Sequence, residues 1–447
     1  MYAMKNKLIK LLRNVDETDI SGIKNMLLKP VNMIISLLYT PLLLSYLGDE
    51  KYGLWSTILS IIHWIDYCDI GIGHGLRNLL TRELTEKEYE KAKKSVSTAY
   101  VVLSAIAFVI LLFLVIWTFV FNWNSFFNTE INMKYPMLIT FVFLVINFVL
   151  ALSNTLLYSL QLSERVALRS SLVQLFNLAG VFLLNIFTHA NLIYMAILFG
   201  ATSSVIYIAN SIQIFKKYKY LCPSIKSFDK SKISEISNLG LKFFVIQLSV
   251  LLMYSVDRVI ITHYFGPEDV TALDVTNKIF SLGNTFLAAM MVPYLSRTTE
   301  ALKKGNILWI KKAVRKMYSF YLLFAVAYIV LALLFKPLMK IYIGRELDYQ
   351  SGLIFTMCLY YLVYSFVTIN TPFINGTGEI NAQLVVSVIS GIISVPLSIY
   401  LGVNCGLETV GVKLATTIIL LFGAVFYPIN LHMILKKAEK NLKSTET

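Results

Sequence analysis

Apolar runs, separated by short polar stretches, fill most of the 447-residue chain. Each run is about 20 residues long, which is what an α-helix needs to cross ~30 Å of hydrocarbon. Backbone polar groups find no water in that layer, so helices, which satisfy their own backbone, are the expected structure. The pattern therefore predicts an all-α integral membrane protein. The twelve predicted spans are residues 25–47, 54–78, 96–121, 135–160, 170–188, 192–213, 239–265, 273–295, 318–340, 350–374, 382–402 and 410–433.

Composition supports a membrane protein, because hydrophobic residues make up 57% of the chain and charged residues only 15%. The net charge of +14 comes from basic residues in short loops, which offers no basic face for nucleic acid. If loops alternate between the two sides, one side collects 31 of the 40 Lys and Arg residues. The other side holds six, including Lys413 at the outer start of the twelfth span. Cytoplasmic loops carry such an excess, so both termini are expected in the cytoplasm.

The longest hydrophilic stretch, residues 214–238, divides the predicted helices into two sets of six. A Tyr-x-Gly-x-Glu pattern that starts at Tyr46, at the end of the first span, recurs at Tyr264, at the end of the seventh. Such a repeat predicts two six-helix bundles around a central cavity. The predicted parts are an N-terminal segment (1–24), a first bundle (25–213), a cytoplasmic linker (214–238), a second bundle (239–433) and a cytoplasmic tail (434–447).

Sequence motifs for catalysis are missing. The chain has no G-x-x-x-x-G-K-[ST] phosphate loop and no H-E-x-x-H zinc motif. Its loops are all short compared with even a small catalytic domain. The four cysteines are scattered and lack companion histidines at ligand spacing, so neither a metal site nor a disulfide framework is expected. The sequence favours transport over catalysis, without a cofactor.

Charged residues inside the predicted spans are the candidate functional groups, because each costs a few kcal/mol unless it faces a partner or a cavity. The seventh span holds Lys242 and the adjacent pair Asp257 and Arg258. Neighbouring helical residues point about 100° apart, so one of the pair can face the cavity while the other packs into its own bundle. In the eighth span, Asp274 and Lys278 are four residues apart on one helix face. Either they form an ion pair within the helix, or Lys278 helps line a cationic cavity.

The second span is the most polar one. His63, Asp66 and Asp69 recur every three residues along one side of it, and a glycine-rich stretch then leads to Arg77. Histidine and buried carboxylates titrate near neutral pH, so this stripe can serve as a proton relay. Alternatively, the stripe forms hydrogen bonds between helices, and the glycines permit close helix packing.

Three stretches of the chain carry a family resemblance. They are Tyr46-Leu-Gly-Asp-Glu-Lys-Tyr-Gly-Leu-Trp55, Asp69-Ile-Gly-Ile-Gly-His-Gly-Leu-Arg-Asn78, and Ser255-Val-Asp-Arg-Val-Ile-Ile261 before Tyr264-Phe-Gly266. They resemble bacterial polysaccharide exporters, in particular the Wzx-type flippases of O-antigen and capsule. That family belongs to the MOP superfamily, together with the MATE drug exporters and the lipid II flippases.

The resemblance implies a V-shaped pair of six-helix bundles in the bacterial inner membrane, which open a cationic cavity to either side in turn. The implied cargo is an oligosaccharide repeat unit on undecaprenyl pyrophosphate, and the implied partners are the polymerase and chain-length regulator of the same pathway. A Lys or Arg in a low-dielectric cavity attracts such an anion. The substrate-binding candidates are Arg258, Lys278, Lys242 and Arg77, and the ion-coupling candidates are His63, Asp66, Asp69, Asp257 and Asp274.

Three other functions remain open at the level of sequence. A MATE-type exporter of cationic drugs needs net acidic groups in its cavity, whereas Arg258 and Lys278 lie beside the carboxylates here. A lipid II flippase commonly has two further helices after the twelfth. A membrane polysaccharide polymerase or ligase usually carries one large periplasmic loop, and the outer loops here are short.

Overall fold

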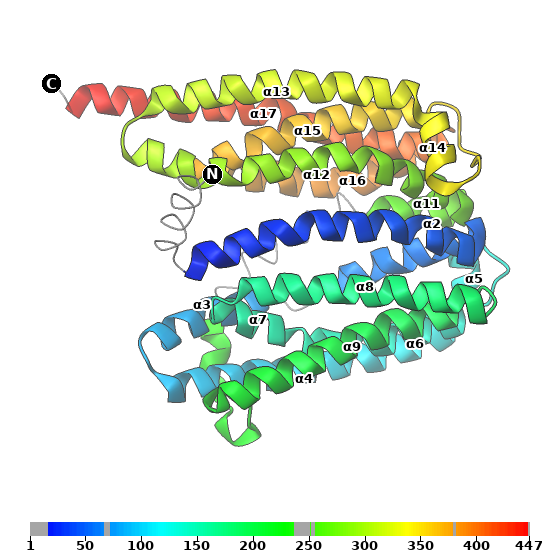
Figure 1. Cartoon of the computed structure of the whole chain (residues 1–447), viewed down its shortest axis with the longest axis horizontal. Coiled ribbons are helices and arrows are strands. Elements are labelled where there is room, and N and C mark those ends of the chain that lie inside the picture. Colours follow the sequence, from blue (N-terminus) through cyan, green and yellow to red (C-terminus); the bar gives the residue numbers. More distant parts are fainter. Residues whose placement is uncertain (1–16, 67–71, 237–250, 252–254, 379–380, 446–447) are drawn as a thin grey trace, which may run out of the picture. The chain divides into compact units, whose positions relative to one another are not determined.

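The computed structural model describes residues 17–66, 72–236, 251, 255–378 and 381–445, and in these ranges the chain is helical with no β-strand (Figure 1). Ten helices in this part of the chain are long and apolar enough to cross a membrane. The chain is therefore a multi-pass membrane protein, as its hydropathy predicts. The expected total of twelve counts the two halves of one long helix separately. It also includes the span at 239–265, of which residues 251 and 255–265 are described.

The described residues fall into two compact units. The N-terminal unit lies within Met1–Lys51, Ile65–Asn124 and Ile131–Phe244. The C-terminal unit lies within Tyr52–Trp64, Ser125–Glu130 and Val245–Thr447. Along the chain, the last change from one unit to the other thus follows the polar stretch at 214–238.

The N-terminal unit is built from hydrophobic helices with polar contacts between them. Its helices are α2 (Glu17–Asp66), α3 (Ile72–Thr85), α4 (Tyr89–Val120), α5 (Trp123–Phe126), α6 (Lys134–Leu150), α7 (Leu152–Ser159), α8 (Ser163–Phe187) and α9 (Leu192–Lys217), of which α2 and α5 are shared with the C-terminal unit. Helix α4 packs against α3 and α6, and α9 packs against α6 and α8. Asn210 on α9 donates to the Ser153 hydroxyl at 3.0 Å, and Ser204 donates to Asn147 Oδ1 on α6 at 2.9 Å. Such hydrogen bonds hold helices together where the hydrophobic effect cannot.

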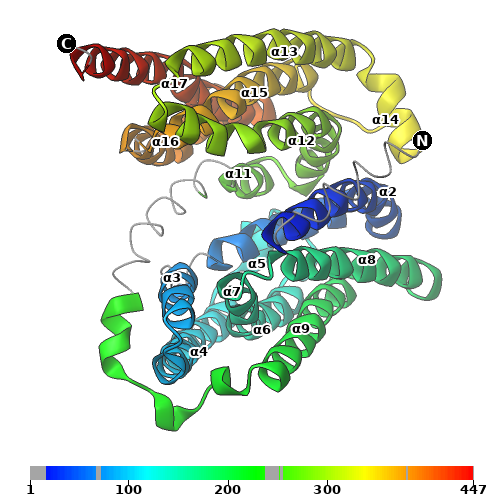
Figure 2. The same cartoon turned by 60° about the vertical axis from the view of Figure 1, so that its left-hand side comes forward.

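The C-terminal unit has α15 at its centre. Its helices are α11 (Val256–Tyr264), α12 (Pro267–Lys303), α13 (Ile307–Leu333), α14 (Phe335–Ile343), α15 (Leu353–Thr377), α16 (Asn381–Ile399), a π-helical turn (Tyr400–Asn404) and α17 (Glu408–Thr445). Helix α15 packs against α12, α13 and α17, and Figure 2 shows these helices from a second direction. The Phe280 ring on α12 stacks with Tyr361 on α15 and with Tyr328 on α13, so aromatic contacts tie three helices together.

Two glycines break the chain at the repeated Tyr-x-Gly-x-Glu pattern. Gly48 interrupts α2 with φ 72° and ψ 178°, between the predicted spans 25–47 and 54–78. Gly266 has φ 112° and precedes Pro267, which starts α12. Positive φ values of this kind favour glycine over residues that carry a Cβ atom. The sequence repeat therefore marks the same kind of helix break in the two halves of the chain.

A third glycine lets two segments of the C-terminal unit touch. A Cβ atom on Gly53 would collide with the backbone carbonyl of Pro267 at the start of α12. Backbone atoms cannot swing aside as a side-chain end can. The hydroxyls of Thr57 and Thr262, 2.5 Å apart, join the same half of α2 to α11. Residues 52–64 are thus packed closely into the C-terminal unit.

The polar stretch at 214–238 is held on the N-terminal unit over its described residues. It contains two short 3₁₀ turns, Lys219–Leu221 and Ile225–Ser227. The Asp229 backbone N–H donates to Thr98 on α4 at 3.0 Å. Lys232 is buried and forms an ion pair at 3.0 Å with Glu83 on α3, which is itself buried. The predicted linker is therefore anchored through a buried charge.

Two pKa shifts accompany this anchoring. Hydrogen bonds from the Ser231 hydroxyl and backbone N–H lower the pKa of Asp229. Burial lowers the pKa of Lys232, but the hydrogen bonds to Glu83 and Glu235 outweigh burial and leave this pKa raised. Both groups are thereby favoured in their charged forms.

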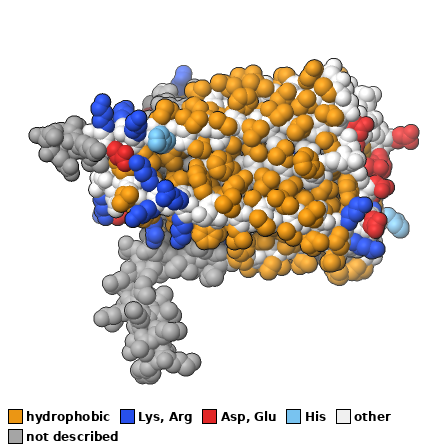
Figure 3. Space-filling view, turned by 90° about the horizontal axis from the view of Figure 1, so that it is seen from above, with side chains coloured by type: hydrophobic (Ala, Val, Ile, Leu, Met, Phe, Trp, Pro, Cys, Tyr) orange, Lys and Arg blue, Asp and Glu red, His pale blue; other side chains and the backbone are white. Residues whose placement is uncertain are grey.

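The outer surface has the amphipathic arrangement of a membrane protein. Figure 3 shows a wide band of hydrophobic side chains, with Lys and Arg gathered at one end of the view and most of the acidic side chains at the other. On α13, Leu322, Leu323 and Val326 are all more than half exposed. Exposed apolar side chains at this density fit contact with lipid.

Candidate functional site

A cluster of charged side chains lies inside the C-terminal unit and starts from two adjacent residues of α11. Asp257 and Arg258 point in different directions, as neighbouring residues on a helix do. Asp257 reaches α17, where its carboxylate meets Lys413. Arg258 reaches α12, where its guanidinium meets Asp274. One short helix thus ties two long helices together through opposite charges.

The pair Asp257 and Lys413 is deeply buried. The carboxylate and ammonium groups are 3.4 Å apart, and the two side chains are 10% and 8% exposed. Thr416, one turn after Lys413 on α17, donates its hydroxyl to Asp257 at 2.9 Å. The Lys413 ammonium also lies 3.5 Å from the centroid of the Tyr360 ring, a cation–π contact. Each buried charge is therefore compensated by specific neighbours.

The pair Arg258 and Asp274 is more open. Nε and one Nη of Arg258 both contact Asp274 Oδ1 at 2.8 Å, and the Ser56 hydroxyl from the second half of α2 donates to Oδ2. Asp274 is 8% exposed, whereas the Arg258 side chain is 29% exposed. The carboxylate is thus enclosed by its partners while part of the guanidinium remains accessible.

These groups line a cavity of about 320 Å³ in the C-terminal unit. Apart from Leu273, its other walls are polar or aromatic, and they include Asn277, Asn284 and Tyr361. The Tyr361 hydroxyl donates to Asn277 Oδ1 at 2.7 Å. Cations and neutral donors therefore line one cavity together with two carboxylates that are already paired.

Lys278 adds a further positive charge beside this cluster. It lies one turn after Asp274 on α12 and is half-buried. Arg258, Lys413 and Lys278 then stand against Asp257 and Asp274, so the cluster holds one more cation than anions. Such an excess in a region of low dielectric constant attracts an anion more strongly than it would in water.

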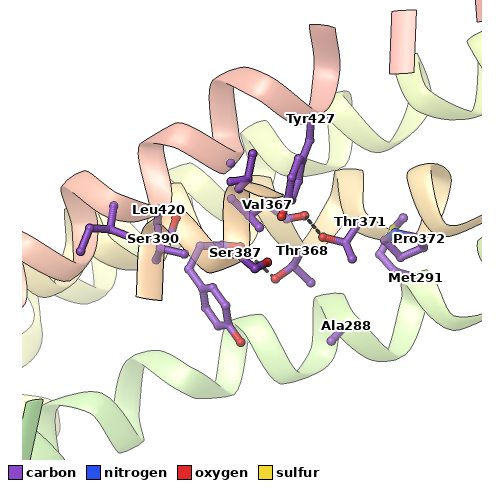
Figure 4. Close-up of a pocket in the computed structure, with 14 residues that line it drawn as sticks. Ala288, Met291, Val367, Thr368, Thr371, Pro372, Ser387, Ser390, Leu420 and Tyr427 are labelled. Atoms are coloured by element: carbon purple, nitrogen blue, oxygen red, sulfur yellow. Dashed lines mark hydrogen bonds between the residues drawn. The ribbon is translucent and has the colours of Figure 1, made fainter. Parts of the chain in front are cut away.

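A second cavity, of about 340 Å³, adjoins the cationic one (Figure 4). Tyr364 lines both cavities, and the Thr368 hydroxyl oxygen in the second lies 3.1 Å from Asn284 Oδ1 in the first. The lining residues of the second cavity are uncharged. Hydroxyl groups come from α15, α16 and α17, including Thr371, Ser387 and Tyr427. This cavity suits an uncharged group that carries hydrogen-bonding atoms.

The remaining predicted site residues lie elsewhere. Arg77 belongs to α3 in the N-terminal unit, where its guanidinium carbon sits 4.8 Å from the centroid of the Tyr158 ring. Lys242 and Asp69 lie outside the described residues, and so do the side chains of His63 and Asp66. The proton relay at His63, Asp66 and Asp69 therefore stays a prediction.

Lys413 is the site residue that sequence reasoning missed. Charge counting assigns it to the outer side of the membrane, but in the structure it is buried in α17. Its partner Asp257 is 156 residues away along the chain. The one available signal is the position of Lys413 inside the predicted span 410–433. No group of three or more His, Cys, Asp or Glu side chains that could hold a metal ion occurs in the part of the chain that the structure describes.

Comparison with known sequences identifies the family. Residues 21–299 match the family described as polysaccharide biosynthesis protein. The chain belongs to this family. Residues 243–400 also match the MatE family. A protein of Yersinia pseudotuberculosis assigned to O-antigen export is 22% identical over 388 residues, which cover 84% of this chain and 87% of that protein. A protein of Salmonella typhimurium assigned to O-antigen transport is 22% identical over 332 residues, 71% of this chain and 73% of that protein.

Solved structures show the same fold. An inward-facing multidrug transporter of the MATE family and MOP superfamily superimposes with a TM-score of 0.76 at 15% identity, covering 91% of this chain and 96% of the other. The lipid II flippase MurJ, in an inward closed conformation, gives a TM-score of 0.73 at 16% identity, with coverage of 94% and 90%. The predicted relationship to MATE exporters and lipid II flippases is therefore confirmed for the fold. The two relatives are named as an exporter and a transporter of O-antigen, and neither is named as an enzyme.

Proposed function

We propose that this protein is a flippase that moves an oligosaccharide repeat unit of O-antigen or capsule, linked to undecaprenyl pyrophosphate, from the cytoplasmic to the periplasmic leaflet. The observation that carries the proposal is Arg258, which is 29% exposed and lines a cavity whose charged side chains, counted together with the neighbouring Lys278, include one more cation than anions. The O-antigen transport relatives support the class of cargo. The proposed location is a bacterial inner membrane, with both termini in the cytoplasm, in a pathway that includes a polymerase and a chain-length regulator.

The cationic cavity has the chemistry to bind the carrier pyrophosphate. The guanidinium of Arg258 carries five N–H donors, and its contacts with Asp274 use those of Nε and one Nη. Its planar fork matches phosphate oxygens, which the point charge of a lysine does not. Arg258 can therefore bind the cargo anion while Asp274 keeps the guanidinium oriented.

The adjoining uncharged cavity suits the first sugar of the cargo. Thr368 and Thr371 donate to the carbonyl oxygens of Tyr364 and Val367, at 2.8 and 2.9 Å (Figure 4). A hydroxyl that donates to the backbone presents its oxygen lone pairs as acceptors, which matches the hydroxyl donors of a sugar. In this proposal the pyrophosphate lies at Arg258, the sugar lies beyond Tyr364, and the lipid tail stays in the bilayer.

The same geometry disfavours a MATE-type exporter of cationic drugs, although the fold is shared. A cationic drug would meet Arg258 and Lys413 in the cavity, and both carboxylates there are already engaged by these cations. The net attraction for a second cation is therefore small. Binding of a cationic dye with micromolar affinity at this cavity would favour the drug-export function instead.

Deletion of the gene tests the proposed function. A deletion strain should lose its surface polysaccharide and accumulate lipid-linked repeat units on the cytoplasmic leaflet. Complementation with the wild-type gene should restore both. Normal surface polysaccharide in a clean deletion strain that has no second flippase would show that the proposal is wrong.

Variants of Arg258 then test the site. Arg258→Ala should be inactive, and Arg258→Lys should keep part of the activity because it keeps the charge but loses the fork. Arg258→Ala also leaves the Asp274 carboxylate buried without its partner, so the double variant Arg258→Ala/Asp274→Ala is needed. If Arg258 binds cargo, the double variant should accumulate normally yet stay inactive. Recovery of activity in the double variant would reduce Arg258 to a structural role; Arg297→Ala, at an exposed position of α12, is the matched control.

A further inference from the structure

The largest of the cavities described lies in the N-terminal unit, far along the sequence from the cationic cluster. Its volume is about 610 Å³, and α2, α7, α8 and α9 line it. Helices α2 and α8, which both contribute lining residues, run side by side in the two ribbon views (Figures 1 and 2). Lys29 on α2 and Arg169 on α8 supply its charges, and the other lining residues carry no carboxylate. Two cationic side chains line this cavity and no carboxylate does, which indicates a site for an anion.

Arg169 is held in a position that leaves part of its guanidinium unsatisfied. One Nη donates to Gln213 Oε1 on α9 at 2.8 Å. The other, Nη1, is buried and has no hydrogen-bond partner among the described residues. A buried guanidinium nitrogen without an acceptor is costly, and an anionic oxygen in the cavity would satisfy it. Asn32, Asn154 and Tyr207 add neutral polar groups to the same walls.

Arg77 brings a third positive charge close to this cavity. Its guanidinium lies over the ring of Tyr158, and Tyr158 lines the cavity. The Arg77 carbonyl also accepts a hydrogen bond from Ser159 at 3.3 Å, which ties α3 to the end of α7. The positive potential in the cavity thus comes from three different helices.

The surface beside the cavity is apolar and exposed. Next to Asn32 on α2, Val31 and Ile34 are 47% and 58% exposed. Next to Arg169 on α8, Leu168 is 49% exposed, and Phe176 two turns later is 54% exposed. A cationic pocket beside lipid-facing apolar side chains recognises an amphiphile, with the charged head in the pocket and the chain along the helices. Basic pockets between transmembrane helices on the cytoplasmic side bind lipid head groups in this way.

We infer that this cavity binds the phosphate of an anionic lipid head group. Lys29 and Arg169 belong to the side of the membrane with the excess of basic residues, which the proposed topology places in the cytoplasm. The site is separate from the cationic cavity of the C-terminal unit. It would hold either the carrier lipid before transport or an anionic phospholipid that stays bound, since the two share the same phosphate chemistry.

Binding to the purified full-length protein tests the inference. The protein is reconstituted in phosphatidylcholine nanodiscs and titrated with undecaprenyl pyrophosphate, with phosphatidylglycerol, or with inorganic pyrophosphate, and bound lipid is measured by native mass spectrometry. Lys29→Gln and Arg169→Gln should each weaken lipid binding by about tenfold, as expected for the loss of one charge-assisted contact. Arg165→Gln removes the same charge one turn earlier on α8 and should change binding little.

The three probes separate the possible occupants. Tighter binding of undecaprenyl pyrophosphate than of phosphatidylglycerol identifies a carrier site, and equal binding identifies a general anionic lipid site. Both results support the inference. Equal affinity for free pyrophosphate would overturn the lipid assignment, because the apolar flanks would then contribute nothing. Wild-type binding in both variants would overturn the site itself; Lys29 is exposed, so its variant does not depend on core packing.

This test is independent of the proposed function. The double variant Arg258→Ala/Asp274→Ala changes only the other unit and should leave the binding of phosphatidylglycerol at Lys29 and Arg169 unchanged. A protein that binds lipid here but does not support surface polysaccharide would contradict the proposed function alone. A protein that supports surface polysaccharide but shows no effect of the Lys29 and Arg169 variants on binding would contradict this inference alone.

Discussion

Replacing Lys413 by methionine should destabilise the C-terminal unit strongly. Methionine keeps most of the side-chain volume but removes the ammonium group that faces Asp257 at 3.4 Å. Asp257 is 10% exposed, so its carboxylate would be left buried without its cation, with the Thr416 hydroxyl still in place. Breaking one partner of a buried ion pair costs about 3–5 kcal/mol. A domain of 150–250 residues loses roughly 2–4 °C per kcal/mol, so the melting temperature should fall by roughly 6–20 °C.

An exposed ion pair in the same unit provides the control. Lys311 on α13 and Glu439 on α17 are 2.6 Å apart, closer than the buried pair, but their side chains are 44% and 41% exposed. Solvent screening limits such a pair to about 0–1 kcal/mol, so Lys311→Met should shift the melting temperature by a few degrees at most. Burial, and not distance, should therefore decide the size of the effect.

The assay is thermal unfolding of the purified variants in detergent, followed by size-exclusion chromatography with fluorescence detection. The double variant Lys413→Met/Asp257→Asn removes the uncompensated charge and should recover most of the lost stability. Two results would refute the reasoning. One is a Lys413→Met protein with the same melting temperature as the wild type. The other is a double variant whose melting temperature is no higher than that of Lys413→Met.

Three further predictions follow from the fold. Gly53→Ala should lower the melting temperature more than Gly344→Ala, because the new Cβ at position 53 would meet the Pro267 backbone. Gly344 has open space, and alanine there costs only about 1–2 kcal/mol for its positive φ. Equal melting temperatures would contradict the packing argument. Lys232→Met should expose residues 219–232 to trypsin, since it removes the buried contact with Glu83. In the wild type, protection from trypsin should stay constant between about pH 5 and 9, because the lowered pKa of Asp229 keeps its carboxylate charged into stronger acid and the raised pKa of Lys232 keeps its ammonium charged into stronger base. A change in protection inside that pH range would count against the anchoring. Reporter fusions after residue 440 should be active with a cytoplasmic reporter, and periplasmic alkaline phosphatase activity there would overturn the proposed topology.

The helices could be predicted from the sequence because length and hydropathy are local properties. The repeat at Gly48 and Gly266 was also visible, since both glycines sit at breaks that follow apolar runs. The rotation of about 100° per helical residue predicted that Asp257 and Arg258 point in different directions, and the four-residue spacing offered Lys278 as a partner for Asp274. The structure places Asp274 against Arg258 and Ser56, on other elements. A local sequence pattern predicts the direction of a side chain on its helix, but it does not predict which distant segment that side chain contacts.

Lys413 shows where sequence reasoning ends. A lysine near the end of a span is usually a loop or interface residue, and charge counting treats it so. Its burial depends on Asp257 and Tyr360, which come from two other helices and are separated from it by dozens of residues or more. For Arg77, the structure shows a contact with the Tyr158 ring of the N-terminal unit, and its role in a central cavity stays a prediction.

The pairing of charges in the C-terminal unit also affects how the protein responds to the membrane voltage. The electrical work of moving one elementary charge across the membrane is about 2.3 kcal/mol per 100 mV of membrane potential. Asp257 and Lys413 form a pair without net charge, and so do Arg258 and Asp274. A conformational change that shifts these four groups through the field therefore does almost no electrical work. In the empty protein, these two pairs should therefore add almost no voltage dependence to reorientation, whereas Lys278 and an anionic cargo, which no such pairing neutralises in the count of charges, should add to it.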